Sequence, residues 1–291
     1  MTGTKPDLRG KNVLVTGGSM GIGYAAASAC LRAGARITIC ARKQADVQQA
    51  VERLEAVSPG QVRGAPADVT DIGQLNRIMD LLEREQGPMS AVIHSAGIYG
   101  PIGKITEVDP NEWFDAVRVN LFGTFLVARQ AAIRLMRHGG GRMAFFSGGG
   151  AATPFPHYTA YACGKVGVAR LVETLAIEFA PFRIELNCIA PGFVATRLHQ
   201  KTLDAGPERA SPEFFAQTRD KVEGGSAVPP EVGADCAAFL ISDVAEGITG
   251  RFVAAPYDKY TDWIKHLDRI RKSDLFTLRR IVPKDRGEDW Q

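Results

Sequence analysis

The residues best placed to do chemistry are Tyr161 and Lys165, four positions apart at the head of an apolar run over 166–179. Residues four apart on a helix share one face, so the ammonium of Lys165 is expected near the phenol of Tyr161. A phenol ionises near pH ~10, and a neighbouring cation would lower that pKa toward the working range of a proton exchanger. Tyrosine and lysine also meet at this spacing as a core aromatic and a solvated amine. The pair therefore indicates catalysis only if a cofactor site lies upstream.

Such a cofactor site is predicted at the start of the chain. A β-rich run at 12–16 leads directly into a glycine-rich turn, and an Ala-rich helix is expected over 24–32. The glycines would let the backbone approach a pyrophosphate, and the helix N-terminus would supply N–H groups. The spacing is T-G-x-x-x-G-x-G from Thr16 to Gly23. The expected cofactor contacts in this turn are Gly17, Ser19, Met20, Gly21, Ile22 and Gly23.

The second strand, expected at 36–40, carries the signal for the type of cofactor. A site that prefers NAD places an acidic residue about 20 positions past the glycines, and none stands there. Arg42 occupies that neighbourhood, and a guanidinium suits a ribose 2′-phosphate. The alternative is a solvated arginine at a strand end. The sequence favours NADP(H) and leaves NAD(H) possible.

Strands and helices alternate along the rest of the chain. Further strands are expected at 62–66, 91–94, 142–146, 184–189 and 250–255, and helices at 46–57, 72–84, 112–136, 161–179 and 231–241. This order predicts the α/β class, with one doubly wound Rossmann-type domain and ligands at the carboxyl ends of its parallel strands. Polar or small residues fall at these ends: Thr16, Arg42, Asp68, Ala96, Ser147 and Pro191. Asp71 is expected to cap the helix at 72–84, and the long segment 193–230 to form a lid or extra helices.

Composition excludes several other classes of protein. A net charge of +3 is too small to indicate binding to nucleic acid or to a membrane surface, and no apolar run approaches the ~20 residues of a membrane span. Segment 1–10 lacks the apolar core of a signal peptide. The five cysteines include no C-x-x-C pair, which favours reduced thiols in a cytoplasmic protein and gives no metal site.

Taken together, these motifs resemble those of the short-chain dehydrogenase/reductase family, from Leu8 to about Val253. The matching elements are the glycine turn, Asp68-Val69, Ala96-Gly97, Asn120, Ser147, Tyr161-x-x-x-Lys165, Asn187 and Pro191-Gly192 with Thr196. The resemblance implies cofactor contacts at Asp68, Val69, Ala96, Gly97, Tyr161, Lys165, Pro191, Gly192, Val194 and Thr196.

The resemblance also implies catalytic roles. Tyr161 would be the general acid/base, and Lys165 would lower its pKa and hold the nicotinamide ribose. Ser147 would hydrogen-bond the substrate oxygen, and Asn120 would support a proton relay through water. The expected function is hydride transfer between NADP(H) and a carbonyl or secondary alcohol, as a ketoreductase. The first alternative is an NAD-dependent alcohol dehydrogenase. The second, which the sequence favours much less, is a dinucleotide-binding protein that catalyses no reaction. The family implies a homo-oligomer, a dimer or tetramer formed through the helices of Asn120 and Lys165.

The sequence departs from the family pattern in four places. His94-Ser95 replaces the usual Asn-Asn, which puts a structural contact in doubt, and Ser147 is the sole serine candidate. The common Val-Asp-Gly-Gly is missing at 253–258, and an extension, 256–291, follows the catalytic domain, 1–255. Trp263, Leu267 and Ile270 have helical spacing within it. The extension is expected to pack on its own subunit, or to cover the substrate cleft or a subunit interface, so truncation after Pro256 should harm activity or assembly.

The substrate is the least determined part of this prediction. Five polar residues lie near the catalytic motif or follow Thr196: His157, Tyr158, Arg197, His199 and Lys201. If some of them face the pocket, a polar or anionic substrate is expected, such as a sugar derivative or a carrier-linked acyl group. The alternative is that they are solvated loop residues.

Overall fold

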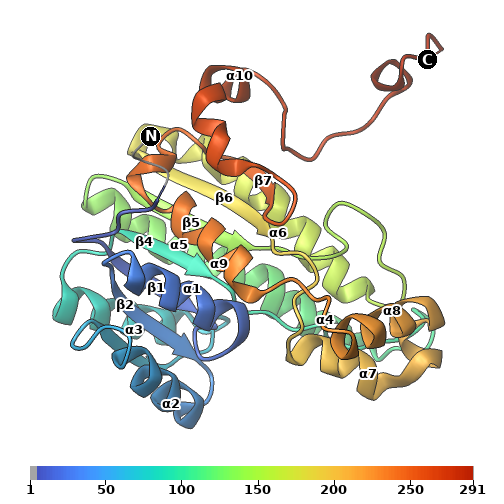
Figure 1. Cartoon of the computed structure of the whole chain (residues 1–291), viewed down its shortest axis with the longest axis horizontal. Helices are drawn as coiled ribbons and strands as arrows, with labels where there is room; N and C mark the ends of the chain where they lie inside the picture. Colours follow the sequence, from blue (N-terminus) through green and yellow to red (C-terminus); the bar gives the residue numbers. More distant parts are fainter. Residues whose placement is uncertain (1–4, 291) are drawn as a thin grey trace.

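The computed structural model describes residues 5–290, so Met1 to Thr4 of the predicted N-terminal segment and Gln291 of the extension lie outside the described residues. Its centre is a seven-stranded parallel sheet in the order β3-β2-β1-β4-β5-β6-β7 (Figure 1). The strands are β1 (Asn12–Thr16), β2 (Arg36–Ala41), β3 (Val62–Pro66), β4 (Ala91–His94), β5 (Gly141–Phe146), β6 (Ile184–Ala190) and β7 (Arg251–Ala254). The predicted doubly wound Rossmann-type architecture is confirmed.

Ten α-helices within residues 5–290 connect these strands or follow the last of them. They are α1 (Gly21–Arg32), α2 (Gln44–Glu55), α3 (Ile72–Gln86), α4 (Pro110–Val117), α5 (Gly123–Arg137), α6 (Thr159–Glu178), α7 (Arg197–Ala210), α8 (Pro212–Glu223), α9 (Pro230–Leu240) and α10 (Leu267–Arg271). Asp71 caps α3 as predicted, because its side chain accepts a hydrogen bond from the Gln74 backbone N–H. None of the described helices is both long and apolar enough to cross a membrane.

Helices cover both faces of the sheet. One hydrophobic core joins alternate strand residues, such as Val13, Val15 and Ile37, to α1, α2 and α9. The other joins the intervening residues, such as Leu14 and Cys40, to α3, α5 and α6. Successive side chains of a strand point to opposite faces, so nearly continuous apolar strands are what a sheet buried on both sides requires.

The parallel register gathers the carboxyl ends of the strands at one edge. Thr16 pairs with Cys40 on one side and with His94 on the other, and Phe146 pairs with Ile189. The strand order reverses between β1 and β4, where doubly wound sheets bind their ligands. The loops after β1, β4, β5 and β6 therefore meet at one place.

The single helix predicted at 112–136 was wrong in detail. The chain forms α4, then the π-helical turn η1 (Arg118–Phe122), then α5. A π turn places one residue more in the turn than an α-helix does, which changes the direction of the side chains that follow. Asn120 lies in this turn and is fully buried.

The extension folds against the sheet edge formed by β7. A 3₁₀ segment, η4 (Tyr260–His266), precedes α10, and both Trp263 and Ile270 join the main core. The buried guanidinium of Arg251 donates to the carbonyls of Ile270 (2.8 Å), Ser273 (3.1 Å) and Leu275 (2.8 Å). After residue 278 the chain runs outward to the C-terminus at the upper right of Figure 1, through the short turn η5 (Pro283–Arg286).

Candidate active site

A cleft of about 600 Å³ opens at the carboxyl ends of β4, β5 and β6, beneath α7 and α8. These two helices, at the lower right of Figure 1, occupy the segment for which a lid or extra helices were predicted. Nine of the predicted site residues line the cleft: Ile22, Gly97, Ser147, Tyr161, Lys165, Pro191, Gly192, Val194 and Thr196. The topology thus brings together groups from the three loops after β4, β5 and β6, from the start of α1 and from α6.

Tyr161 and Lys165 occupy the first two turns of α6 and are almost fully buried, at 6% and 5% exposure. The ammonium of Lys165 lies 5.7 Å from the centre of the Tyr161 ring and donates to the Phe146 carbonyl at 2.9 Å. The phenol oxygen lies against Gly148, where any larger residue would collide with it. Ser147 Oγ donates to the Lys165 carbonyl at 3.0 Å, so its hydrogen must turn away from that carbonyl to reach a substrate oxygen.

Burial controls the protonation of this group of residues. Desolvation raises the pKa of Tyr161 above its ordinary value, which is the opposite of the expected lowering by Lys165. Desolvation also lowers the pKa of Lys165 to about 8. The phenol is therefore protonated at neutral pH, and the lysine is largely still an ammonium.

Asn120 holds the loop after β4 and lies beside Lys165. Its amide accepts from the Ile98 N–H at 3.0 Å and donates to the Ile98 carbonyl at 2.7 Å. A Cβ added to Gly97 would lie 3.0 Å from Asn120 Oδ1 and 3.2 Å from Lys165 Nζ. Since both ends of its amide bond to one residue, the side chain fixes the cleft wall next to the ammonium.

The turn after β1 fits a dinucleotide phosphate. Gly17 has φ +67°, and a Cβ there would lie 2.8 Å from the Ala96 nitrogen, so only glycine lets the two loops meet. Helix α1 has no side-chain cap at Met20 and no acidic residue in its first turn. Its free N–H groups and the positive end of its dipole favour an anion. Gly21 faces Thr196, with 3.6 Å between an added Cβ and the threonine methyl, so the glycine turn and the loop after β6 lie close together at this end of the sheet.

The family model described as short chain dehydrogenase matches residues 11–206, which is well over half of the chain. The chain belongs to the short-chain dehydrogenase/reductase family. This confirms the resemblance drawn from the motifs. The protein is thus an oxidoreductase of a family that acts on alcohols and carbonyl compounds with nicotinamide dinucleotides.

Relatives and solved structures agree with this assignment. A short-chain type dehydrogenase/reductase of Picea abies is 32% identical over 256 residues, covering 84% of this chain and 91% of its own. D-threitol dehydrogenase of Mycolicibacterium smegmatis is 32% identical over 243 residues, covering 84% and 90%. The structure is similar to a short-chain type dehydrogenase/reductase from Mycobacterium ulcerans, with TM-score 0.73, 27% identity and coverage of 93% of this chain and 98% of that one.

The family departure at His94 has a structural explanation. Its Nδ1 and the Thr16 hydroxyl form a buried hydrogen bond of 2.7 Å between neighbouring strands. Burial, with a smaller contribution from the charge of Lys165, lowers the pKa of His94 to about 3. The imidazole is therefore neutral, and its hydrogen bond joins β1 to β4 at the carboxyl ends of these strands.

The other predicted cofactor residues do not line the cleft. Gly18 N donates to the Cys40 carbonyl at 3.2 Å, which brings the exposed Arg42, two residues later, toward this turn. Asp68 Oδ1 accepts from the N–H (2.8 Å) and hydroxyl (2.7 Å) of Thr70, and Asp68 lines a separate surface hollow. Val69 is buried against α5. The remaining predicted contacts, Gly17, Ser19, Met20, Gly21, Gly23 and Ala96, belong to the turn or the loop beside it.

Only one of the five polar residues considered for the substrate lines the cleft. His199 does so, while Arg197 and Lys201 are exposed on α7 away from it. Tyr158 is fully buried and its hydroxyl donates to Thr202 Oγ1 at 2.9 Å. His157 Nδ1 bonds the Arg209 carbonyl at 2.7 Å. These two residues attach the loop before α6 to α7.

Sequence reasoning missed the aromatic lining of the cleft. These residues are Tyr99, Phe155, Phe193, Phe214 and Tyr257, together with Gln217 and Lys221 of α8. The frequency of aromatic residues around 155–161 and 193–215 was the available signal. Tyr257 shows that the start of the extension also reaches the cleft.

Proposed function

We propose that this enzyme is an NADP(H)-dependent ketoreductase that uses Tyr161 as its general acid. The observation that carries the proposal is a buried, protonated phenol that shares one cleft with Ser147 and Lys165. A group that must donate a proton at neutral pH works best when its pKa keeps it protonated there. A protonated phenol can serve as the acid in the reduction of a carbonyl group.

The residues of the cleft divide the work of the reaction. A bound nicotinamide dinucleotide supplies the hydride that reaches the carbonyl carbon. Tyr161 donates its proton to the carbonyl oxygen, and Ser147 donates a hydrogen bond to the same oxygen once it leaves the Lys165 carbonyl. The ammonium of Lys165 stabilises the phenolate that Tyr161 becomes. Asn120, which holds Ile98, keeps the wall beside that ammonium in position.

The NADP(H) preference rests on Arg42. Its exposed guanidinium follows β2 beside the glycine turn, where an NAD enzyme would have a carboxylate. Fluorescence titration of NADPH and NADH tests this with wild type and Arg42→Ala. We expect NADPH to bind at least 10-fold more tightly, and the difference to collapse in Arg42→Ala because a charged hydrogen bond is lost. Arg84→Ala, on the distant helix α3, is the matched control and should bind both as wild type does.

Equal or tighter binding of NADH by wild type would reassign the enzyme as an NAD-dependent alcohol dehydrogenase. Binding of neither dinucleotide would overturn the proposed catalytic function.

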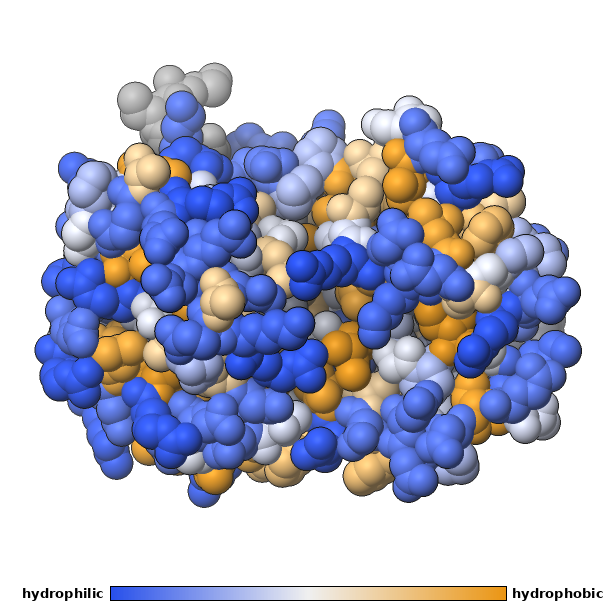
Figure 2. Space-filling view, turned by 90° about the horizontal axis from the view of Figure 1, so that it is seen from below, coloured by the Kyte–Doolittle hydropathy of each residue, from blue (hydrophilic) through white to orange (hydrophobic). Residues whose placement is uncertain are grey.

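A homo-oligomer is also proposed, formed through α4, η1, α5 and α6. Large apolar side chains are exposed on these elements: Phe114 (63%), Phe122 (45%), Phe125 (40%) and Ile177 (79%). Figure 2, seen from below, shows hydrophobic patches among the hydrophilic residues, the larger of them in the half of the molecule where Figure 1 places α4, α7 and α8. Exposed apolar groups of this size are typical of protein interfaces. Sedimentation velocity measures the assembly, and a monomer at micromolar concentration would contradict it.

A further inference from the structure

A row of aromatic rings leads from the catalytic phenol to a second lysine. The rings of Tyr161 and Tyr99 lie 4.8 Å apart, and those of Tyr99 and His199 lie 6.0 Å apart. His199 packs on Phe193 at 3.9 Å, and Lys221 Nζ lies 4.8 Å from the centre of the Phe193 ring. All five residues line the cleft. The ammonium of Lys221 thus stands at the far end of an apolar wall that begins at the reacting centre.

The charge of Lys221 has no matching carboxylate in the cleft. No aspartate or glutamate is among the residues that line it within the described chain. The ion pair on α8 joins Arg219 to Asp220 at 3.7 Å and leaves Lys221 out. The side chain is half-buried, so water screens its charge only in part. A half-buried cation beside an aromatic face attracts an anion more strongly than an exposed lysine does.

His199 adds a second unsatisfied polar group at the same place. Its buried Nδ1 has no hydrogen-bond partner among residues 5–290. Burial lowers the pKa of His199 to about 4, because it outweighs a backbone contact at Val194 that raises the pKa and is reinforced by the nearby charge of Lys221. The ring is therefore neutral at pH 7. A neutral imidazole can donate or accept one hydrogen bond there. Buried polar atoms are normally paired, so an unpaired one in a cleft points to a ligand.

We propose that Lys221 and His199 form a subsite for an anionic group, a carboxylate, at the far end of the carbonyl substrate. The substrate's apolar body would lie along Tyr99, Phe193 and Phe214, with its ketone at Tyr161. The inference rests on the proposed ketoreductase function and adds a substrate class to it: oxo acids in which a hydrophobic spacer separates the ketone from the carboxylate.

The test compares methyl-ketone oxo acids, from levulinate upward in chain length, with their carboxamides. We expect wild type to prefer the acid of the best-fitting length over its amide by about 10- to 100-fold in kcat/KM, the value of a charged hydrogen bond. Lys221→Met should remove most of this preference by raising KM for the acid, with a much smaller effect on KM for the amide. Lys221→Arg should keep it. His199→Phe, which retains a ring on Phe193, should reduce it by about 3- to 10-fold. Lys201→Met, on exposed α7, is the control and should match wild type.

Equal turnover of acid and amide by wild type would overturn the subsite. So would a loss of NADPH affinity in Lys221→Met, since Lys221 would then belong to the cofactor site. Calorimetry, which measures binding of the acids without turnover, separates the proposed subsite from the proposed ketoreductase function. Acid binding that is lost in Lys221→Met, without turnover of any ketone, would support the subsite and overturn the ketoreductase. Absence of both binding and turnover of the acids, in a protein that reduces other ketones, would overturn the subsite alone.

Discussion

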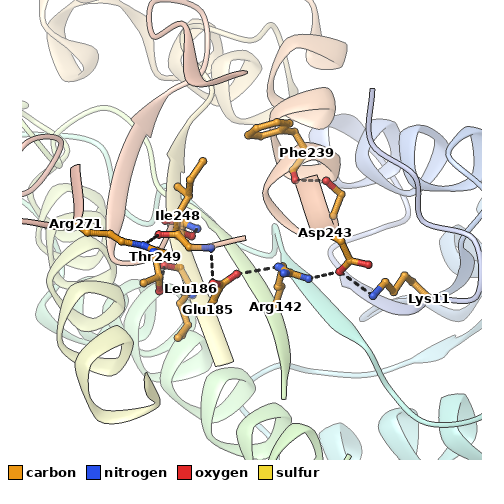
Figure 3. A network of polar contacts seen from close by, with 12 residues as sticks. Lys11, Arg142, Glu185, Leu186, Phe239, Asp243, Ile248, Thr249 and Arg271 are labelled. Carbon is orange, nitrogen blue, oxygen red and sulfur yellow. Dashed lines mark hydrogen bonds and ion pairs between the residues drawn. The ribbon is translucent and has the colours of Figure 1, made fainter. Parts of the chain in front are cut away.

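The amino ends and the carboxyl ends of β5 and β6 differ in how their polar side chains are paired. At the amino ends, Arg142 donates to Glu185 at 2.9 Å and to Asp243 at 2.6 Å, and Lys11 binds the same Asp243 oxygen at 3.0 Å (Figure 3). Glu185 also accepts from the Gly247 N–H at 2.6 Å. Every charge in this network faces an opposite charge or a backbone dipole.

At the carboxyl ends of the same sheet, the described residues form no ion pair with the cleft lysine and leave two ring nitrogens without hydrogen-bond partners. Lys165 binds only a backbone carbonyl, and burial lowers its pKa to about 8. One ring nitrogen of His94 and one of His199 are buried without partners within the described chain. The comparison shows a sheet whose polar groups are paired at the amino ends of its strands and are available to a ligand at the carboxyl ends. This is expected where function opposes stability.

The largest expected effect is on catalysis at the carboxyl edge. Tyr161→Phe removes the proton donor, so kcat should fall by about 100- to 10,000-fold, the usual contribution of a positioned general acid. NADPH affinity should stay the same, because the ring is retained. Tyr158→Phe is the control. It loses the hydroxyl bond to Thr202, about 1 kcal/mol of stability, and should keep near wild-type kcat. Steady-state kinetics measure both variants, and similar rates for the two would remove Tyr161 from the mechanism.

His94 makes the carboxyl edge sensitive to acid. Its pKa is about 3 in the folded protein and near 6.5 when unfolded, so the unfolded chain binds the proton more tightly. The stability associated with a neutral His94 is present above pH 6.5 and is lost progressively as the pH falls toward 3. His94→Asn removes this titration. Between pH 7 and pH 4, the free energy of unfolding of wild type should therefore fall by about 3 kcal/mol more than that of His94→Asn.

Urea unfolding at both pH values measures this difference. His138→Asn, on the surface beside Glu83, is the control for loss of a histidine and should cost less than about 1 kcal/mol of stability at pH 7. Parallel curves for wild type and His94→Asn would mean that His94 does not titrate as proposed.

The smallest effect is expected at the amino edge, and on stability alone. Arg142→Met leaves Glu185 partly buried without its cation, which should cost about 2 kcal/mol, less than for a fully buried pair because these side chains are 15% and 19% exposed. Activity per folded molecule should not change. Arg84→Ala breaks an exposed pair with Glu85 and should cost less than about 1 kcal/mol. A fall in kcat of Arg142→Met at full folding would show that the two edges are coupled.

The sheet was predictable because its signals are local. All seven strands lie within one residue of their predicted bounds at either end, since apolar β-rich runs are bounded by glycine, proline or polar turns. The π turn at Asn120 was not predictable, because inserting one residue into a helical turn leaves the apolar spacing of 112–136 nearly unchanged. Helix α1 begins at Gly21, three residues before its predicted start, because its first glycines were assigned to the turn.

The candidate site was predictable only where a motif fixes it. Tyr161, Lys165 and Ser147 meet in one cleft because the sheet topology places their loops together. The direction of the Tyr161 pKa was predicted wrongly, since four-residue spacing describes proximity to Lys165 but not the desolvation that outweighs it. Lys221 lies on α8, 60 residues after Tyr161, and its position over Phe193 depends on tertiary packing that no local pattern encodes.

The extension also has a consequence for solubility. Strand β7 is the last strand of the sheet, and its Phe252 N–H donates to the Phe276 carbonyl of the extension at 2.7 Å. Trp263 stacks on Phe276 at 4.0 Å and holds that segment against the sheet. A chain cut after Pro256 would present a bare strand edge to other molecules, the usual starting point for aggregation. Its first symptom would be light scattering during expression or storage, before any change in chemistry could be measured.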